Sequence, residues 1–477
     1  MHTKHWKVFA ITLFMFTLGT SATSWASAPV VEWSRTFGGS GSDSASAIQQ
    51  TNDGGFIFVG TSNSNDGDVS GNRGGWDGWV VRLDADGDIT WQRSLGGSGS
   101  DGFVSVQQTM GGGFIVAGDS SSNDGDVSEN RGDRDGWVVK LDADGEIEWQ
   151  RTFGGSRQDR IRDIRQTADG GYVFTGGTYS KDGDILEHSF LRKPFQVEQN
   201  VLIWLIDMLL GPPLIRPEKH PDHPFPSSDV WIVRLDAEGE ILWQRVLGGS
   251  MNDEGNAIRQ TNDGGYIVAA TSSSRGPGLL GLGPPENRDG GGGIWIIKLD
   301  SEGNVLWQRV LGGSRGEWAR DIQQTKDGGY IVVGASMSSD GDVSRNRGRA
   351  DAWVVKLDTD GKIEWQISLG GSGTESFSSV QQTLDGGYIV AGGSNSSDGD
   401  VPGNRDDRDG WIVKLDAGGD IEWQKLLGGP YRDGFTSIQQ TLGGGYIVAG
   451  VANSRDGDVS GNRGYSDAWI IKLRPEM

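Results

Sequence analysis

The chain has 477 residues, no cysteine and a formal net charge of −22. The absence of cysteine excludes disulfides, thiolate metal sites and a lipid anchor on an N-terminal cysteine. So acidic a chain would repel the phosphate backbone of a nucleic acid, which argues against nucleic acid as a partner.

The first segment predicts export. Lys4 and Lys7 precede the apolar run 8–20, and small residues follow it, as in a secretory signal peptide. We expect residues 1–26 to be removed, leaving 27–477 as a monomer in the periplasm or outside the cell. The alternative is an uncleaved membrane anchor, for which the apolar run is short. No transmembrane segment is expected in the mature chain.

Seven copies of one phrase fill the mature chain, and a tryptophan heads each copy. Successive heading tryptophans lie 58 residues apart, except that 94 residues separate the third from the fourth and 64 the fourth from the fifth. These tryptophans are Trp33, Trp91, Trp149, Trp243, Trp307, Trp365 and Trp423. A fixed period of this kind indicates a repeat architecture.

Each copy predicts four β-strands separated by turns. In the first copy the strands are 45–51, 56–61, 79–83 and 88–95. The segments 52–55 and 84–87 between them contain Asp and Gly, which favour tight turns and therefore antiparallel neighbours. The second strand is apolar on both faces, which predicts burial, whereas the fourth alternates between apolar and polar residues, which predicts an edge.

Four such strands form one blade of a β-propeller, which buries its faces only when neighbouring blades stack on both sides. The mature chain begins with a fourth strand, 30–37, and ends after a third strand, 469–473. We therefore predict an all-β fold, a closed seven-bladed propeller of four-stranded antiparallel blades whose N-terminal strand completes the last blade. An open solenoid would need polar capping repeats, which neither end supplies.

A second tryptophan recurs in the third strand of each copy. It is found at Trp79, Trp137, Trp231, Trp295, Trp353, Trp411 and Trp469. Because the position repeats in every copy, we interpret these side chains as packing between blades. Carbohydrate stacking is the alternative.

The phrase LDADGEIEW at 141–149 and the recurring DGGYIVAG resemble the repeats of bacterial secreted β-propeller proteins of uncharacterised function. The similarity covers residues 30–474. A weaker similarity is to the tryptophan-docking motif of quinoprotein-like propellers, in which an Asp, a Gly turn and a Trp lock adjacent blades. The resemblance implies the fold, but such propellers include enzymes, assembly scaffolds and adhesins. The docking turn here is one residue shorter than the quinoprotein pattern, which argues against quinone binding.

The loop 66–77 between the second and third strands has a spacing typical of calcium loops. Oxygen side chains occupy its positions one, three, five, seven and twelve: Asp66, Asp68, Ser70, Asn72 and Asp77. The alternative is that these side chains satisfy backbone groups of the loop without metal. The equivalent candidate ligands are Asp124, Asp126, Asp135, Asp340, Asp342, Asp351, Asp398, Asp400, Asp409, Asp456, Asp458 and Asp467.

An acidic residue heads the first strand of every copy. The seven are Asp43, Asp101, Asp159, Asp253, Glu317, Glu375 and Asp433. We expect them to ring the mouth of the central channel, where they could bind cations or supply a carboxylate pair for glycoside cleavage. Because a catalytic pair is normally unique within its ring, we favour a role in turn formation.

Two adjacent blades depart from the repeat. Blade 3 carries an insertion at 185–228, and blade 4 replaces its acidic loop with the Gly/Pro-rich stretch 272–293. The insertion contains an apolar run at 201–210, for which we consider a short helix folded onto the disc or an exposed docking or membrane-touching element. Its candidate partner-binding residues are Trp204, Leu205, Leu209, His220 and His223. His220 and His223 could also hold a transition metal.

No catalytic motif is evident in the sequence. We therefore predict a non-enzymatic secreted scaffold that binds a protein or glycan partner through the loop face of blades 3 and 4. The alternatives are a calcium-dependent surface adhesion module and a quinoprotein-like or polysaccharide-cleaving enzyme. Calcium is the one cofactor that the sequence suggests.

Overall fold

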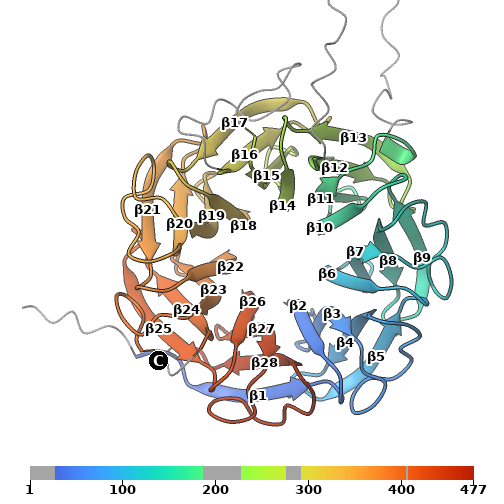
Figure 1. The fold of residues 1–477 in the computed structure, drawn as a ribbon, viewed down its shortest axis with the longest axis horizontal. Coiled ribbons are helices and arrows are strands. Elements are labelled where there is room, and N and C mark those ends of the chain that lie inside the picture. Colours follow the sequence, from blue (N-terminus) through green and yellow to red (C-terminus); the bar gives the residue numbers. More distant parts are fainter. Residues whose placement is uncertain (1–26, 186–226, 275–291, 404–406, 477) are drawn as a thin grey trace, which may run out of the picture.

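A computed structural model describes residues 27–185, 227–274, 292–403 and 407–476. These residues form seven four-stranded antiparallel sheets arranged in a closed ring (Figure 1). Blades 1 to 6 are β2–β5, β6–β9, β10–β13, β14–β17, β18–β21 and β22–β25, and blade 7 combines β26–β28 with β1. The predicted seven-bladed propeller is confirmed. None of the described segments is a helix long and apolar enough to cross a membrane.

Each blade runs from an innermost strand at the channel to an outermost strand at the rim. The innermost strands are β2 (Asp43–Gln50), β6 (Asp101–Gln108), β10 (Asp159–Gln166), β14 (Asp253–Gln260), β18 (Glu317–Gln324), β22 (Glu375–Gln382) and β26 (Asp433–Gln440). The second strands are β3 (Phe56–Ser62), β7 (Phe114–Ser120), β11 (Tyr172–Thr178), β15 (Tyr266–Ser272), β19 (Tyr330–Ser336), β23 (Tyr388–Ser394) and β27 (Tyr446–Ala452).

The third strands are β4 (Asp77–Leu83), β8 (Asp135–Leu141), β12 (Asp229–Leu235), β16 (Gly293–Leu299), β20 (Asp351–Leu357), β24 (Asp409–Leu415) and β28 (Asp467–Leu473). The outermost strands are β5 (Ile89–Leu95), β9 (Ile147–Phe153), β13 (Ile241–Leu247), β17 (Val305–Leu311), β21 (Ile363–Leu369), β25 (Ile421–Leu427) and β1 (Val31–Phe37). Second and third strands are almost wholly buried, whereas the outermost strands are half exposed, as the residue alternation predicts.

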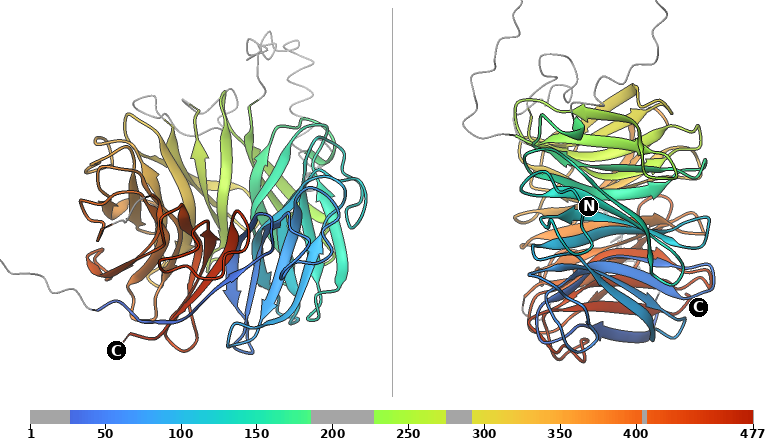
Figure 2. Two further views of the ribbon diagram at one scale, coloured as in Figure 1. Left: turned by 60° about the horizontal axis from the view of Figure 1, so that its bottom comes forward. Right: turned by 90° about the vertical axis from the view of Figure 1, so that its right-hand side faces the viewer.

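The N-terminal strand closes the ring. β1 pairs antiparallel with β28, with Ser34 opposite Ile471, and completes the sheet β1-β28-β27-β26 (Figure 2). The indole Nε1 of Trp469 donates a hydrogen bond of 2.9 Å to Ser34 Oγ, and Val31 packs on the core of blade 7. The last blade is therefore held by both ends of the propeller, as predicted.

Both sets of recurring tryptophans pack between neighbouring blades. Trp79 and its six equivalents are wholly buried, and Trp79 Nε1 donates to Gln92 Oε1 at 3.0 Å. Trp91 of the outermost strand lies edge-on to Phe114, with ring centroids 5.9 Å apart. It also lies against Gly145 in the turn of the next blade, where a Cβ would come within 2.9 Å of the ring. The packing interpretation is confirmed, and the turn glycine is needed because it leaves room for the indole.

We expect Trp91→Ala to lower the free energy of unfolding by about 3 kcal/mol, because it removes an aromatic pair and leaves a cavity between two blades. Urea denaturation measures this. Trp76→Ala is the matched control, since Trp76 lies in a loop and is 37% exposed. Equal losses in the two variants would contradict the docking role.

Candidate functional site

The innermost strands surround the axis of the ring (Figure 1). Each has a hydrogen-bonded neighbour strand on one side only, so the N–H groups on its channel side need acceptors from elsewhere. Each strand also carries a β-bulge at the same place, between Ala45 and Ala47 in β2. The bulge brings two successive side chains to the channel, Ser46 and Ala47 in this strand.

A belt of glutamine side chains supplies acceptors around the whole ring. In every blade a turn N–H donates at 2.7–2.9 Å to a glutamine Oε1 of the next blade. The pairs are Asn52–Gln108, Met110–Gln166, Ala168–Gln260, Asn262–Gln324, Lys326–Gln382, Leu384–Gln440 and Leu442–Gln50. This belt joins the seventh blade to the first.

A second belt, formed by the glutamine one residue earlier in each innermost strand, is interrupted in blades 3 and 4. Gln49, for example, accepts the N–H of Gln108 from the next blade at 2.6 Å, and four equivalent bonds exist. In blades 3 and 4 the glutamine is replaced by Arg165 and Arg259. A guanidinium cannot accept a hydrogen bond, so donors accumulate at this point of the channel.

The channel wall of blades 3, 4 and 5 is charged, whereas that of the other four blades is neutral. The channel-facing positions are the second, fourth, fifth and seventh residues of each innermost strand. At these positions blades 1, 2, 6 and 7 carry only Ser, Ala, Gly, Val, Thr or Gln. We call the charges of β10, β14 and β18 the charged sector. It comprises Arg160, Arg162, Asp163, Arg165, Glu254, Arg259, Arg320 and Asp321.

An ion-pair network crosses three blades at the centre of this sector. Arg259 of β14 pairs with Asp163 of β10 and, at 2.6 Å, with Asp321 of β18. Arg165 pairs with Asp163 at 3.0 Å. Asp163 also accepts hydrogen bonds from Ser105 Oγ at 2.9 Å and from the N–H of Ile258 at 3.0 Å. Every lone-pair direction of Asp163 is thus occupied.

The network sets the charge states of its members. Burial raises the pKa of Asp163, but the positive charges of Arg165 and Arg259 outweigh burial and hold its pKa below the ordinary value. Burial also raises the pKa of Asp321, against the effect of Arg259. Asp163 is therefore an ionised structural carboxylate, and this state does not suit a general acid.

Two cavities lie along the channel, of about 110 Å³ and about 230 Å³. Arg165, Arg259 and Asp321 line both, so the network lies where the two meet. Arg162 and Arg320 line the first cavity, which lies nearer the start of the innermost strands. Arg162 pairs with Glu254 at 2.7 Å.

The start of the innermost strands lies on the face from which the loops between second and third strands emerge; we call this the loop face. The N–H of Asp253, which opens β14, donates to Ser228 O of the loop before β12. The described chain leaves this face after Ile185 and after Ser274. The described ends of these two irregular loops lie in blades 3 and 4, which also contribute to the charged sector.

The predicted calcium loops use their oxygens within the fold. Asp66 Oδ1 accepts the N–H of Ser40 at 2.7 Å, and Asp68 accepts the N–H of Gly38 at 3.2 Å and pairs with Arg463 at 3.0 Å. The hydrogen bond from Ser40 lowers the pKa of Asp66. These contacts agree with the backbone-satisfying alternative.

The other loop residues are engaged in part. Asn72 accepts the N–H of Gly74, Ser70 accepts a hydrogen bond from Gln92, and Asp77 accepts the N–H of Arg73 through Oδ2. Asp77 Oδ1 is buried and has no hydrogen-bond partner among the described residues. Among the described residues, the one group of three carboxylates with oxygens within 4.8 Å of one another lies elsewhere, at Asp385, Glu422 and Glu476. Calcium binding by the loops stays a prediction.

The acidic residues that head the innermost strands are buried. The exposed fraction of each side chain is 3% or less. Asp101, for example, accepts hydrogen bonds from Ser120, from Ser122 Oγ at 2.7 Å and from the N–H of Gly97 at 2.8 Å. They fix the connection between blades, as the favoured turn interpretation holds, and do not face the channel as free carboxylates.

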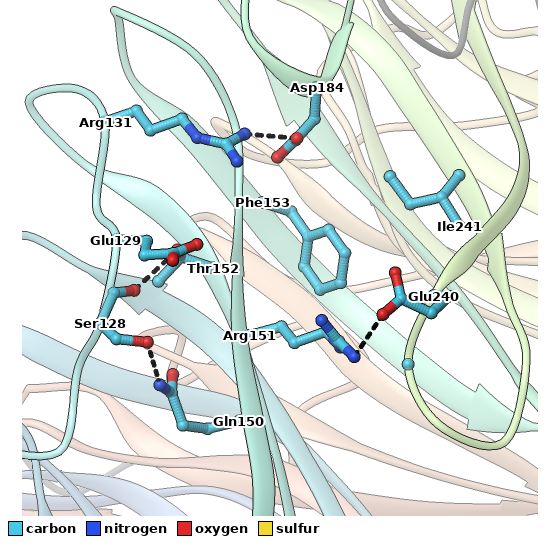
Figure 3. Close-up of a pocket in the computed structure, with 11 residues that line it drawn as sticks. Ser128, Glu129, Arg131, Gln150, Arg151, Thr152, Phe153, Asp184, Glu240 and Ile241 are labelled. Carbon is cyan, nitrogen blue, oxygen red and sulfur yellow. Dashed lines mark hydrogen bonds and ion pairs between the residues drawn. The ribbon is translucent and has the colours of Figure 1, made fainter.

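A polar groove at the rim between blades 2 and 3 has a volume of about 280 Å³ (Figure 3). Glu129 lies in it with φ 64°, where most equivalent loops carry glycine. Two ion pairs line it, Arg131 with Asp184 and Arg151 with Glu240. A similar groove of about 490 Å³ lies between blades 7 and 1. The groove therefore belongs to the repeat.

Sequence reasoning placed the partner site in the blade 3 insertion. Trp204, Leu205, Leu209, His220 and His223 lie outside the described residues. The charged sector was missed. Its signal was available, because the innermost strands read SASAIQQ and FVSVQQ in blades 1 and 2 but IRDIRQ, GNAIRQ and ARDIQQ in blades 3, 4 and 5.

Comparison with known proteins shows no matching family model. Over 113 residues the chain is 26% identical to the regulatory protein FlaEY of Caulobacter vibrioides, a stretch that covers 23% of this chain and 11% of that protein. The chain thus matches about a ninth of the length of this curated relative.

Solved propellers resemble the chain in fold. A protein of unknown function from Bacteroides caccae is 12% identical, with TM-score 0.35 over 74% of this chain and 92% of its own. BamB from Moraxella catarrhalis is 13% identical, with TM-score 0.39 over 90% and 86%. The quinohemoprotein alcohol dehydrogenase ADHIIG from Pseudomonas putida HK5 is 10% identical, with TM-score 0.41 over 94% and 76%.

We expect the melting temperature to fall as the pH rises from about 5 to about 8. Burial, and secondarily the charge of Asp159, raise the pKa of Asp135 to about 7; burial and Asp253 do the same for Asp229. A folded-state pKa above the ordinary 3.8 means that the folded chain binds the proton more tightly. The resulting stability is complete below pH 4 and is lost as the pH rises through about 7.

Thermal unfolding across this pH range measures the effect, and Asp135→Asn should flatten the dependence, because the amide cannot ionise. At the acid end Asp263 and Asp327 act oppositely. Hydrogen bonds from Thr261 and Thr325 and the nearby lysines overcome burial and lower both pKa values to about 2. Their stabilisation is lost as the pH falls below 4. A melting temperature that rises from pH 5 to pH 8 would contradict the first assignment.

Chelation tests the calcium hypothesis. Because the carboxylates of Asp66 and Asp68 already accept backbone and arginine donors, we expect the melting temperature of the mature chain to be the same with calcium and with a chelator. Differential scanning calorimetry of the two samples is the measurement. A marked drop on chelation would instead assign the loops to Ca²⁺.

Proposed function

We propose that the protein is an exported, non-enzymatic propeller scaffold that binds a protein or glycan partner at the channel mouth on its loop face. The observation that carries this proposal is the charged sector. Seven copies of one strand have the same structural task, yet three adjacent copies replace neutral residues by charges. Such local departures from a repeat are typical of functional sites.

The state of the carboxylates supports binding over catalysis. Asp163 and Asp321 are each held by arginine and by backbone N–H groups. A general acid or base needs a proton position that is free to exchange with substrate. The carboxylates of the network instead fix arginine side chains, and fixed arginines are common anchors in protein interfaces.

The loop face supplies the area that the channel lacks. Cavities of about 110 Å³ and 230 Å³ are smaller than typical small-molecule sites. A partner would therefore contact the loops around the mouth and reach the channel with a short element. The irregular loops of blades 3 and 4 leave the described structure on this face.

Site-specific cross-linking in exporting cells tests the proposal. We expect a photo-reactive residue in place of Trp318, at the mouth, to give discrete adducts, because Trp318 is 39% exposed there. The same residue in place of Leu306, 58% exposed on the rim strand β17, is the control and should give none. Mass spectrometry identifies the adduct as protein or glycan. Identical adducts from both positions, or none from Trp318, would overturn the scaffold proposal.

A further inference from the structure

Arginine side chains gather at the channel mouth although the whole chain is strongly acidic. Arg162 and Arg320 line the same cavity, and burial together with the like charge of Arg162 lowers the pKa of Arg320. Arg408 donates a hydrogen bond of 2.8 Å to Ser376 Oγ of the innermost strand β22, and burial, with a smaller contribution from the charge of Arg320, lowers its pKa. Burial raises the pKa of Asp119, against the charges of Arg134, Arg162 and Arg160.

Two carboxylates near the mouth pair with these arginines. Asp119 pairs with Arg134 at 2.7 Å and Glu254 pairs with Arg162 at 2.7 Å. The nearby Glu375 is wholly buried and accepts hydrogen bonds from Ser396 and Gly371 within its own blade connection. Within the charged sector five arginines stand beside three carboxylates, so this part of the channel wall carries an excess of positive charge in a chain of net charge −22.

Several of these donors are unused. Arg320 is exposed to the first cavity and forms no hydrogen bond or ion pair with any residue in the described part of the chain. The Nε atoms of Arg160 and Arg165 are buried and lack an acceptor among the described residues. Asp163 already accepts four donors, so it cannot satisfy them. The complementary ligand is a group that only accepts hydrogen bonds.

We propose that the first cavity binds a carboxylate of an acidic polypeptide segment between Arg162 and Arg320. This inference rests on the proposed scaffold function, because the segment belongs to the partner. An ionised carboxylate accepts hydrogen bonds at both oxygens and matches the fork of a guanidinium. Arg165 and Arg259 line the inner end of this cavity and limit how far the carboxylate can enter.

The shape of the site favours a polypeptide over an acidic glycan. The cavity of about 110 Å³ has room for several water molecules, because one water needs about 10–15 Å³. The cavity thus admits a glutamate carboxylate on its flexible stem. A uronate carboxylate is attached directly to a sugar ring and must bring the ring with it. Trp318, two residues before Arg320 and 39% exposed, can cover the apolar part of an entering peptide.

Binding of a fluorescein-labelled hexaglutamate peptide to the mature chain 27–477 tests the inference by fluorescence anisotropy. We expect saturable binding that weakens with added salt, and no binding of the matching hexaglutamine peptide. Arg320→Gln should weaken binding by about tenfold, since it removes a charge-assisted contact. Arg320 has no partner in the described structure, so the melting temperature of this variant should stay unchanged.

Arg309→Gln is the matched control. Arg309 is exposed on β17, where its Nη1 bonds the carbonyl of Gln308, and its loss changes the net charge equally. We expect it to alter affinity by less than about twofold, because salt screens a charge at the rim. Equal losses in the two variants would mean unspecific attraction and would overturn the inference.

Competitors separate the ligand classes. Trigalacturonate that displaces the peptide at equal or lower concentration would replace the polypeptide by an acidic glycan, and inorganic phosphate that does so would reduce the site to a general anion site; either result overturns the inference. The scaffold proposal is tested apart from this. Cross-linked adducts at Trp318 without hexaglutamate binding would overturn the inference alone, whereas the absence of adducts would overturn the scaffold proposal.

Discussion

Each innermost strand of the ring borders the channel without a partner strand, and its inward N–H groups must still find acceptors. The repeat meets this requirement with side chains of the neighbouring blade, as in the bonds from the N–H of Gln108 to Gln49 and from the N–H of Gln50 to Gln439. These bonds satisfy backbone donors and at the same time join adjacent blades. The position of every other element follows, because blades held together at the axis must stack their apolar faces on one another.

The charged sector departs from this arrangement and compensates for it locally. Arg165 and Arg259 stand where the second belt has glutamine, so two acceptors are lost. Asp163 and Asp321 introduce carboxylates at the β-bulges of β10 and β18. Arg259 then joins three blades through ion pairs with both carboxylates. Because loss of one member would leave a buried charge unpaired, the network holds its side chains in one geometry. A rigid set of arginines at the end of a narrow cavity is suited to recognition.

Charge is distributed unevenly over the molecule. Most carboxylates of the loop face are engaged with backbone N–H groups or arginines, as Asp66 is with Ser40 and Asp68 with Arg463. Arg320, which forms no ion pair among the described residues, faces the channel, where surrounding protein lowers the local dielectric and strengthens its field. The net charge of −22 therefore says little about what the mouth attracts. An acidic protein can present a basic site when the fold separates its carboxylates from some of its arginines.

The sequence by itself determined the number of blades, the strand order and the closure by residues 31–37, because a period with fixed turn signals leaves one way to bury each blade. It also indicated which blades are irregular. The tertiary structure decided that the acidic residues heading the inner strands are buried and that Arg259 meets Asp163 and Asp321. These contacts join residues up to 96 positions apart, in different repeats, and spacing within one repeat carries no information about them. Local patterns fix local structure, whereas the chemistry of the channel depends on how seven similar strands are brought around one axis.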